Sequence, residues 1–183
     1  MRLVARHAPV PAPAAPRSAI RAGGTYLITG GLGDVGPLVA THLAERGAAR
    51  VVLTSRTGRS ETPPALGRLT AAGAEVEIAV ADVTDTARMR ELVGELTRRH
   101  GRIDGVVHAA GETGLDGFVA LRDLGAAGTE RHFAPKLGGA RVLREVLDEL
   151  PATQAPDFAC CSRRSPRCSA ASASPRTRPP TPR

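Results

Sequence analysis

The stretch TYLITGGLGDVG, residues 25–36, decides the fold of this chain. A short β-prone run, Thr25–Thr29, is followed at once by a glycine-rich turn and then by a segment with helical periodicity. Gly31, Gly33 and Gly36 satisfy the spacing G-x-G-x-x-G. Between a strand and a helix, such glycines allow a tight turn, close approach of the backbone to a pyrophosphate, and close packing of the helix on the strand.

The start of the helix after this turn is the second part of the signal. Its free N–H groups and the positive end of its dipole suit the phosphate groups of a ligand. In this strand–turn–helix setting the pattern predicts a dinucleotide site. A purely structural turn between a strand and a helix is the alternative that the pattern alone leaves open.

Strand-like and helix-like segments alternate along the rest of the chain. Further strands are predicted over residues 50–56, 75–83 and 103–111, and a fifth strand begins within residues 156–159. Helices are predicted over residues 35–48, 65–74, 85–101 and 129–150, the last with a break or an early start at Pro135. Val35, Val39 and Leu43 share one face of the first helix, and Asp85 is a candidate N-cap of the third. This alternation predicts an α/β fold: a Rossmann-like doubly wound parallel sheet, incomplete at its C-terminal side.

The end of the second predicted strand indicates which dinucleotide is bound. NAD sites usually carry an acidic residue there for the ribose hydroxyls. This chain has Ser55 and Arg56 instead, and no acid. An arginine at that position can pair with a 2′-phosphate through two parallel hydrogen bonds, which favours NADP(H). A solvated surface arginine is the alternative.

The ends of the third and fourth predicted strands add to the candidate site. Asp82, next to Val83, could accept a hydrogen bond from an adenine amine, or it could be a turn aspartate. Ala109, Ala110 and Gly111 are small enough to leave room for the ribose next to the nicotinamide. His108 is expected to be packed or bonded to backbone. The predicted cofactor-binding residues are Thr29, Gly30, Gly31, Leu32, Gly33, Val35, Gly36, Ser55, Arg56, Asp82, Val83, Ala109, Ala110 and Gly111.

Five segments in order, GGTYLITGGLGDVG, VVLTSRTG, ADVTD, DGVVHAAG and FAPKLGGARVL, resemble the ketoreductase (KR) domain of type I polyketide synthases. That domain belongs to the short-chain dehydrogenase/reductase family, and the resemblance runs from about residue 23 to residue 158. It implies NADPH-dependent reduction of a β-ketoacyl group carried on an acyl carrier protein, with neighbouring synthase domains as partners. Asp34 departs from the family, which usually has a small residue there, although a helix N-terminus tolerates aspartate well.

The resemblance also assigns a role to Lys136. The segment FAPKLGGA matches the family's lysine motif, so Lys136 looks like the catalytic lysine. Such a lysine lowers the pKa of an adjacent tyrosine hydroxyl and makes it a better general acid toward the substrate oxygen. An exposed helical lysine without a catalytic role is the alternative.

The other catalytic residues of the family are missing from this chain. The family has a serine after the fifth strand, a tyrosine thirteen residues later and an asparagine four residues beyond. Here Tyr26, in the first strand, is the only tyrosine. The chain as written is therefore expected to have little or no reductase activity. A non-catalytic dinucleotide-binding or structural reductase-like module is the alternative function.

The last 25 residues, 159–183, differ from the rest of the chain. They contain six of its arginines and no acidic residue, and adjacent Arg163 and Arg164 would be costly to bury in a sheet. A disordered Arg/Ser/Pro-rich tail is predicted from about Ala159. Read one base out of step, Thr177 and Thr181 can become the missing tyrosine and asparagine, four residues apart. The tail is therefore hypothesised to be out of frame, and a genuine disordered tail is the alternative.

Composition excludes several other classes of protein. The net charge of +7 comes almost entirely from residues 159–183, which argues against nucleic-acid binding by the nearly neutral body. Cys160, Cys161 and Cys168 lack metal-site spacing, so no metal is expected. No apolar run is long enough to span a bilayer, and the N-terminus has no secretory h-region, so a cytoplasmic protein without membrane contacts is expected. Three regions are predicted: a Pro/Ala-rich arm (1–22), a KR domain truncated at its C-terminal side (23–158) and the tail (159–183).

Overall fold

The structure is a computed structural model that describes residues 18–57, 66–112, 120, 123 and 125–161. Its strands are β1 (Thr25–Thr29), β2 (Arg50–Ser55), β3 (Glu75–Val80), β4 (Gly105–His108) and β5 (Phe158–Cys161). Its helices are α1 (Gly36–Glu45), α2 (Leu66–Ala71), α3 (Thr86–His100), α4 (Ala126–Phe133) and α5 (Gly139–Asp148), with a π-helical turn, η3 (Ala134–Gly138), between the last two. Most of the predicted arm and tail, residues 1–17 and 162–183, lies outside the described residues.

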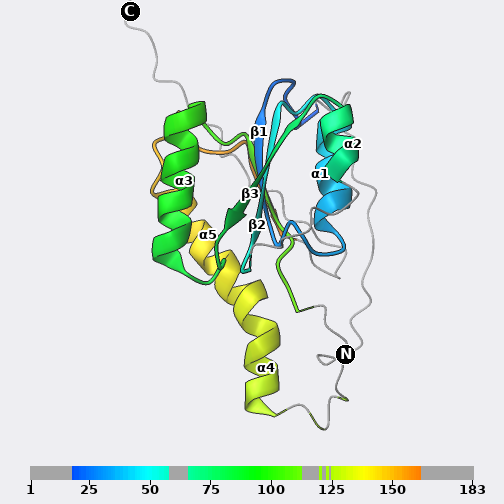
Figure 1. The fold of residues 1–183 in the computed structure, drawn as a ribbon. Helices are drawn as coiled ribbons and strands as arrows, with labels where there is room; N and C mark the ends of the chain where they lie inside the picture. The colour runs from blue at the N-terminus through cyan, green and yellow to red at the C-terminus, as the bar shows by residue number, and fades with distance from the viewer. Residues whose placement is uncertain (1–17, 58–65, 113–119, 121–122, 124, 162–183) are drawn as a thin grey trace, which may run out of the picture.

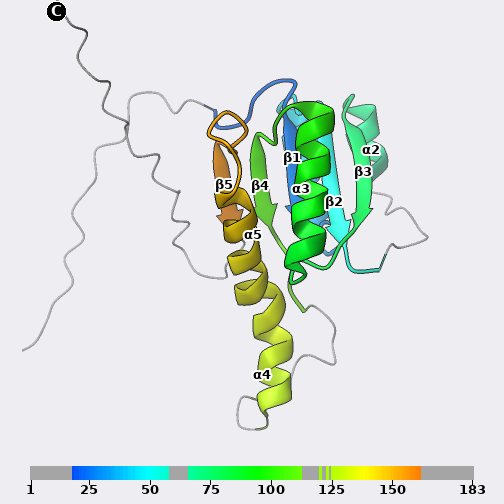
Figure 2. The ribbon, with the colours of Figure 1, turned by 90° about the vertical axis from the view of Figure 1, so that its left-hand side faces the viewer.

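The five strands form one parallel sheet in the order β3-β2-β1-β4-β5. Helices α1 and α2 cover one face, and α3 and α5 cover the other (Figure 1). Figure 2 shows that the chain builds outward from β1 to β3 and then returns to place β4 on the other side of β1. The predicted Rossmann-like doubly wound sheet is therefore confirmed, and its strand order reverses between β1 and β4.

Alternate side chains of β1 enter two separate cores, because both faces of the sheet are covered. Leu27 packs with Val52, Leu92 and Leu96 on the α3 and α5 side. Tyr26 and Ile28 pack on the α1 and α2 side, where their neighbours include Leu43, Val51, Leu53 and Leu69. Burial on two sides explains why the central strands are continuous apolar runs in the sequence.

Two details of the predicted elements are wrong. Val35 precedes α1 and is 46% exposed, so the buried face of that helix is Pro37, Ala40, Leu43 and Ala44, with Val39 only partly buried. Strand β5 also continues to Cys161, three residues beyond the boundary predicted at residue 158. Its backbone pairs with β4 in parallel register, and its position at the edge leaves Ala159 and Cys161 exposed. An edge strand needs no continuous apolar run, which is why the sequence pattern placed the end of this strand too early.

The third and fourth helical predictions fit the structure at their ends. The Asp85 carboxylate accepts a hydrogen bond from the backbone N–H of Arg88, 3.0 Å away, and so caps α3 as predicted. The irregularity expected at Pro135 is the π-helical turn η3, which joins α4 to α5 without ending the helical path. Such turns are rare and are frequent at functional sites.

Charged side chains tie the amino ends of the strands together. Arg21, Arg102, Asp104 and Asp157, here called the amino-end cluster, come from the segments before β1, β4 and β5. Arg21 Nε donates to Asp157 at 2.6 Å, and Arg102 donates a hydrogen bond to the same carboxylate at 2.9 Å. Arg102 Nε lies 3.1 Å from Asp104 without hydrogen-bond geometry, so that contact is an ion pair only. The buried Asp104 carboxylate accepts from the backbone N–H of Thr25 at 2.9 Å.

Candidate functional site

The glycine turn after β1 is held by contacts that leave no room for side chains. Gly30 has a φ of +68°, and a Cβ there would lie 2.5 Å from the Cα of Ala110. A Cβ on Gly31 would lie 2.7 Å from the Leu53 side chain, and one on Gly36 would collide with the Gly31 carbonyl. Gly33 differs: it is exposed, and a Cβ there would meet only the Gly30 carbonyl oxygen, at 3.3 Å. Packing therefore requires three of these glycines, whereas Gly33 has one close neighbour, the Gly30 carbonyl, and is otherwise exposed.

The turn lies at the point where the strand order reverses. The backbone N–H of Ala109 donates to the Thr29 carbonyl at 2.9 Å, just after β4. The close contact of Gly30 with Ala110 joins the two loops further out. The structure thus brings the predicted residues 29–36 and 109–111 together at the carboxyl ends of β1 and β4. In open α/β sheets, ligands bind in the crevice at this position.

The start of α1 suits a phosphate. Val35, at the N-cap, makes no side-chain capping bond, and the first turn contains no acidic residue. Its first N–H groups are therefore not used by a capping side chain. Asp34, the residue that departs from the family pattern, is exposed. These features fit the pyrophosphate of a dinucleotide.

The carboxyl end of β2 lies beside the glycine turn. The Gly31 N–H donates to the Thr54 carbonyl at 2.9 Å, which links the turn to β2. Ser55 is half-buried, and its carbonyl accepts from the N–H of Ala81 at 3.0 Å. Arg56 is exposed and forms no ion pair with any residue of the described ranges. An exposed guanidinium without a described partner fits both the predicted anion contact and the alternative, a solvated surface arginine.

Asp82 has a structural task after β3. Its Oδ1 accepts hydrogen bonds from the backbone N–H and the hydroxyl of Thr84, at 2.8 and 2.7 Å. This is the turn role that the sequence analysis gave as the alternative. A bond to adenine would have to use the other carboxylate oxygen. Val83, next to it, is buried against the start of α5 at Gly139.

His108, the last residue of β4, is buried and bonded on both sides of its ring. Its Nδ1 lies 2.7 Å from the Thr29 hydroxyl, and its Nε2 lies 3.1 Å from the backbone carbonyl of Lys136. Burial lowers the pKa of His108, although its bonds to the Lys136 and Pro135 carbonyls oppose that shift. The predicted packed, backbone-bonded histidine is therefore what the structure contains.

Lys136 lies in η3 at the same end of the sheet. A Cβ on Gly111 would be 3.1 Å from the Lys136 Cε, so the lysine side chain passes over the loop that follows β4. The residue is exposed, and its ammonium makes no hydrogen bond or ion pair with any described residue. The predicted lysine and the predicted cofactor residues after β4 are thus neighbours.

Tyr26, the only tyrosine, lies at the opposite end of the sheet. It is fully buried, and its hydroxyl accepts from the backbone N–H of Arg21 at 2.6 Å. Its ring stacks on Phe158, with 6.2 Å between centroids, and burial raises the pKa of its hydroxyl. Tyr26 therefore cannot be the proton donor beside Lys136.

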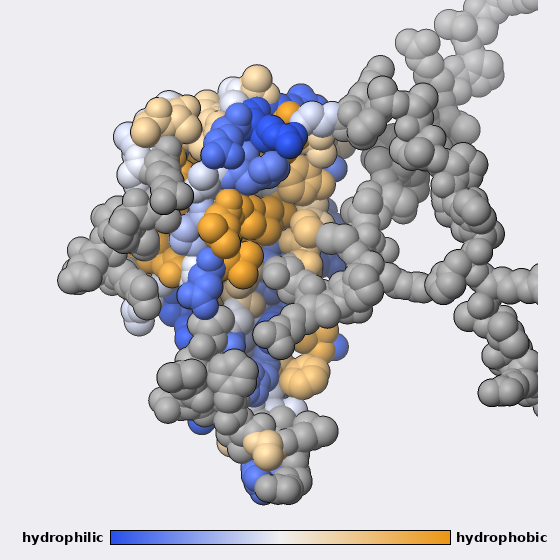
Figure 3. Space-filling model, turned by 90° about the vertical axis from the view of Figure 1, so that its right-hand side faces the viewer, coloured by the Kyte–Doolittle hydropathy of each residue, from blue (hydrophilic) through white to orange (hydrophobic). Residues whose placement is uncertain are grey.

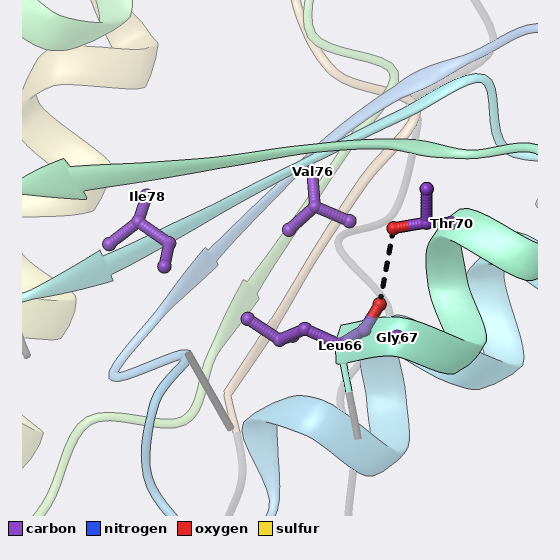
Figure 4. A pocket seen from close by; sticks show the side chains of 5 residues that line it. All are labelled: Leu66, Gly67, Thr70, Val76 and Ile78. Atoms are coloured by element: carbon purple, nitrogen blue, oxygen red, sulfur yellow. Dashed lines mark hydrogen bonds between the residues drawn. The ribbon is translucent and has the colours of Figure 1, made fainter. Parts of the chain in front are cut away.

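A separate cavity of about 350 Å³ opens on the α1 and α2 side of the sheet. Figure 3 shows apolar surface gathered on this face. The cavity is lined by Leu66, Gly67, Thr70, Val76 and Ile78 (Figure 4), and the one hydrogen bond drawn there, from the Thr70 hydroxyl to the Leu66 carbonyl, stays within α2. None of these side chains ionises, so the described part of the lining offers no group for acid–base chemistry.

The described residues contain neither a candidate metal centre nor a membrane-spanning helix. No group of three or more His, Cys, Asp or Glu side chains there could hold a metal ion. Within the same residues, every helix is too short or too polar to cross a membrane.

Sequence reasoning missed the bond from His108 to Lys136 and the amino-end cluster. Both join residues far apart along the chain, 28 residues for His108 and Lys136 and 136 for Arg21 and Asp157. The available signal was local: a histidine at the end of a buried strand, and arginines and aspartates just before strands. Such a local pattern does not identify the residue with which each of these side chains interacts.

Comparison with known proteins identifies the family. The profile of the KR domain family matches residues 24–166. The polyketide synthase PksM of Bacillus subtilis (strain 168) is 39% identical over 131 residues, which are 71% of this chain and 3% of that protein. The chain therefore spans only a small part of that relative.

Two solved structures are also similar. An N-terminal ketoreductase from the macrolactin assembly line superposes with a TM-score of 0.67 and 28% identity, over 80% of this chain and 29% of that one. The NADH-dependent reductase A1-R′, solved in complex with NAD, gives a TM-score of 0.57 and 30% identity, over 68% of this chain and 51% of that one.

Proposed function

This chain belongs to the KR domain family, the ketoreductases of polyketide synthases within the short-chain dehydrogenases/reductases, and from this premise we propose that it binds NADPH. The pyrophosphate would lie on the glycine turn and the start of α1, residues 30–36. The adenosine half would extend toward Ser55, Arg56 and Asp82, and the nicotinamide half toward residues 109–111. Lys136 would stand beside the nicotinamide half.

The observation that carries this proposal is the difference among the four glycines of the turn. Gly30, Gly31 and Gly36 contact protein atoms so closely that packing alone explains them. Gly33 has no such neighbour, because a Cβ there would meet only one carbonyl oxygen at 3.3 Å. A glycine that packing constrains at one carbonyl oxygen only is best explained by a ligand that passes close to the backbone.

The preference for NADPH over NADH rests on Arg56. It is exposed, pairs with no carboxylate among the described residues, and follows the strand next to the glycine turn. A guanidinium there would attract a 2′-phosphate, and no acid is present to bind the free ribose hydroxyls. The similar reductase A1-R′ uses NADH, so the choice depends on this chain's own residues.

The reaction proposed for the site is that of the family: reduction of a β-ketoacyl group carried on an acyl carrier protein, between neighbouring synthase domains. NADPH, when bound, supplies the hydride. Lys136 provides a fixed positive charge at the same end of the sheet, suited to lower the pKa of a nearby hydroxyl.

The chain as given is proposed to bind the cofactor without turning over substrate. Its only tyrosine, Tyr26, is buried at the far end of the sheet, so no tyrosine can protonate the ketone oxygen. An out-of-frame reading of residues 159–183, of which the structure describes only 159–161, would account for this loss. Sequencing the coding DNA from the codon for Pro156 onward tests that reading: an extra or missing base supports it, and an unchanged sequence refutes it.

The proposal is tested by calorimetric titration of the full chain and of Gly33→Ala with NADPH. The wild-type chain should bind, and Gly33→Ala should weaken binding at least about tenfold, roughly 1.4 kcal/mol. Its thermal unfolding should change little. Gly94→Ala in α3 is the matched control, because a Cβ there meets nothing within 4 Å. Equal affinity in all three chains would refute the proposed pyrophosphate position.

A second candidate function, a structural reductase-like module without a cofactor, predicts no heat of binding from the wild-type chain. In that case NADPH should also fail to raise the unfolding temperature, since a ligand stabilises only the state that binds it. Either result separates the two functions before any substrate is needed.

A further inference from the structure

We propose that His108 is a positioning residue for Lys136, which it holds over the loop after β4 by fixing the backbone of the turn that carries the lysine. This rests on the proposed function, because Lys136 matters only if the site binds cofactor. The link runs from the Thr29 hydroxyl at the end of β1, through the imidazole, to the Lys136 carbonyl in η3. It joins the two loops of the candidate site to the helical segment that faces them.

The hydrogen bonds define the form of the imidazole. A backbone carbonyl can only accept, so Nε2 must carry the proton that is donated to Lys136. With the ring neutral, Nδ1 is then an acceptor and the Thr29 hydroxyl donates to it. A neutral ring agrees with the lowered pKa of this buried histidine. His108 therefore has no nitrogen left for substrate.

Packing limits the movement of the turn from the other side. A Cβ on Gly139 would lie 2.9 Å from the His108 Cε1 and 2.7 Å from the Val83 side chain. The missing side chain at Gly139 thus lets the start of α5 approach the imidazole closely. The turn that carries Lys136 is held by a hydrogen bond at one residue and by this contact three residues later.

The Lys136 side chain depends on that backbone. Its Cε passes over Gly111, at 3.1 Å from where a Cβ would stand, and its ammonium has no partner among the described residues. Among the described residues, the position of the ammonium therefore depends on the backbone of the turn alone. If the turn shifts, the amine should leave the nicotinamide side of the site.

The sequence makes this testable, because Lys136 is the only lysine in the chain. Reductive methylation with ¹³C-formaldehyde labels Lys136 and the N-terminal amine alone, and it keeps the positive charge of the lysine. The carbon NMR signal of dimethyl-Lys136 then reports its surroundings in the full chain without cofactor or substrate. Lys136→Arg identifies the signal.

Two amide substitutions separate the two bonds of His108. The side-chain nitrogen of His108→Gln occupies the place of Nε2 and can donate to the Lys136 carbonyl. His108→Asn places its amide near Nδ1, where it can accept from Thr29 but cannot reach Lys136. His108→Leu removes both bonds and keeps much of the volume.

The expected result is a graded response of the Lys136 signal. His108→Gln should keep it near its wild-type position, whereas His108→Asn and His108→Leu should move it at least halfway toward its position in the urea-unfolded chain. The proposal is overturned if His108→Asn and His108→Leu leave the signal unchanged, or if His108→Gln moves it as far as His108→Leu does.

Two further variants keep the test decisive if His108→Leu does not fold. Thr29→Val removes the hydroxyl that supports the ring, and Gly139→Ala pushes the start of α5 away from the imidazole. Gly139→Ala should shift the Lys136 signal in the same direction as His108→Asn, and no shift would refute the proposal. Thr29→Val keeps the bond to Lys136, as His108→Gln does, and should leave the signal near its wild-type position. NADPH titration is scored separately, so a chain that fails to bind cofactor but shows the graded response rejects the proposed function and keeps the role of His108.

Discussion

At the amino ends of the strands, two arginines and two aspartates meet in the amino-end cluster, whereas at the carboxyl ends glycines and alanines bring backbone segments into contact. The first end satisfies its charges within the protein. The second leaves the cations of Arg56 and Lys136 without partners among the described residues. One end of the sheet therefore ties the fold together, and the other is the end at which we propose that NADPH binds.

This division is what a parallel sheet allows. All five strands point the same way, so residues before the strands gather at one end and residues after them gather at the other. Ion pairs at the first end can lock the segments together without blocking the second. Substitutions at the two ends should therefore change different measurements: the free energy of unfolding at the amino end and the dissociation constant for NADPH at the carboxyl end.

The largest expected effect is a loss of stability from a substitution at the carboxyl end, and it is an exception to this division. Gly36→Ala lies at the carboxyl end but should lower the free energy of unfolding by about 3 kcal/mol or more, because its Cβ would collide with the Gly31 backbone. Urea unfolding measures the loss. The matched control, Gly94→Ala in α3, should raise stability by roughly 0.5–1 kcal/mol, the usual gain of alanine over glycine within a helix. Equal stability of both variants would show that the turn can relax.

The next largest effect is a loss of unfolding free energy from a substitution in the amino-end cluster. Asp104→Asn keeps the side-chain volume but removes the buried charge between Arg21 and Arg102, and should cost about 2 kcal/mol of unfolding free energy. NADPH affinity should stay the same. Asp148→Asn, in an exposed pair with Arg144, is the control and should cost less than about 0.5 kcal/mol. A change in NADPH affinity with Asp104→Asn would contradict the division between the two ends.

A smaller effect is expected from Arg56→Gln at the carboxyl end. Loss of the guanidinium should weaken NADPH binding about tenfold, roughly 1.4 kcal/mol, and leave NADH binding unchanged. Calorimetric titration with both cofactors measures the ratio. An equal loss for the two cofactors would mean that Arg56 does not contact the 2′-phosphate.

The smallest effect is an acid sensitivity of the amino end. Desolvation acts to raise the pKa of Asp157, but hydrogen bonds and charge from Arg21 and Arg102 outweigh it and lower the pKa below its ordinary value. The stability that Asp157 contributes is thus present above the pKa of the unfolded chain and is lost as the pH falls through the lower folded value. Unfolding temperatures measured downward from pH 5 should converge for wild type and Asp157→Asn below about pH 4. A constant difference would show that another group titrates.

Much of the fold was predictable because its signals are local. Apolar runs, the spacing of Gly31, Gly33 and Gly36, and the capping aspartate Asp85 each act over a few residues, and the structure contains the elements they predict. The exposure of Val35 was missed because apolar periodicity does not reveal where a helix begins. Strand β5 was cut short because edge strands tolerate exposed residues on one side.

The candidate site was only partly predictable, for the same physical reason. The carboxyl ends of parallel strands meet at one edge, so residues at strand ends could be collected from the sequence as a set. The sequence does not show which of these residues bond to each other. Asp82 accepts hydrogen bonds from Thr84, and His108 bonds to the Lys136 carbonyl. The bond between His108 and Lys136 depends on how the helices pack on the sheet.

The stacked pair of Tyr26 and Phe158 gives the molecule an internal optical probe. The chain has no tryptophan and a single tyrosine, so its ultraviolet emission comes mainly from one buried ring of β1, stacked on Phe158 of β5 at the amino end. The fluorescence of bound NADPH would report from the other end of the sheet at a longer wavelength. Unfolding at the amino end and release of NADPH at the carboxyl end can therefore be followed at two emission wavelengths in one experiment, without an added label.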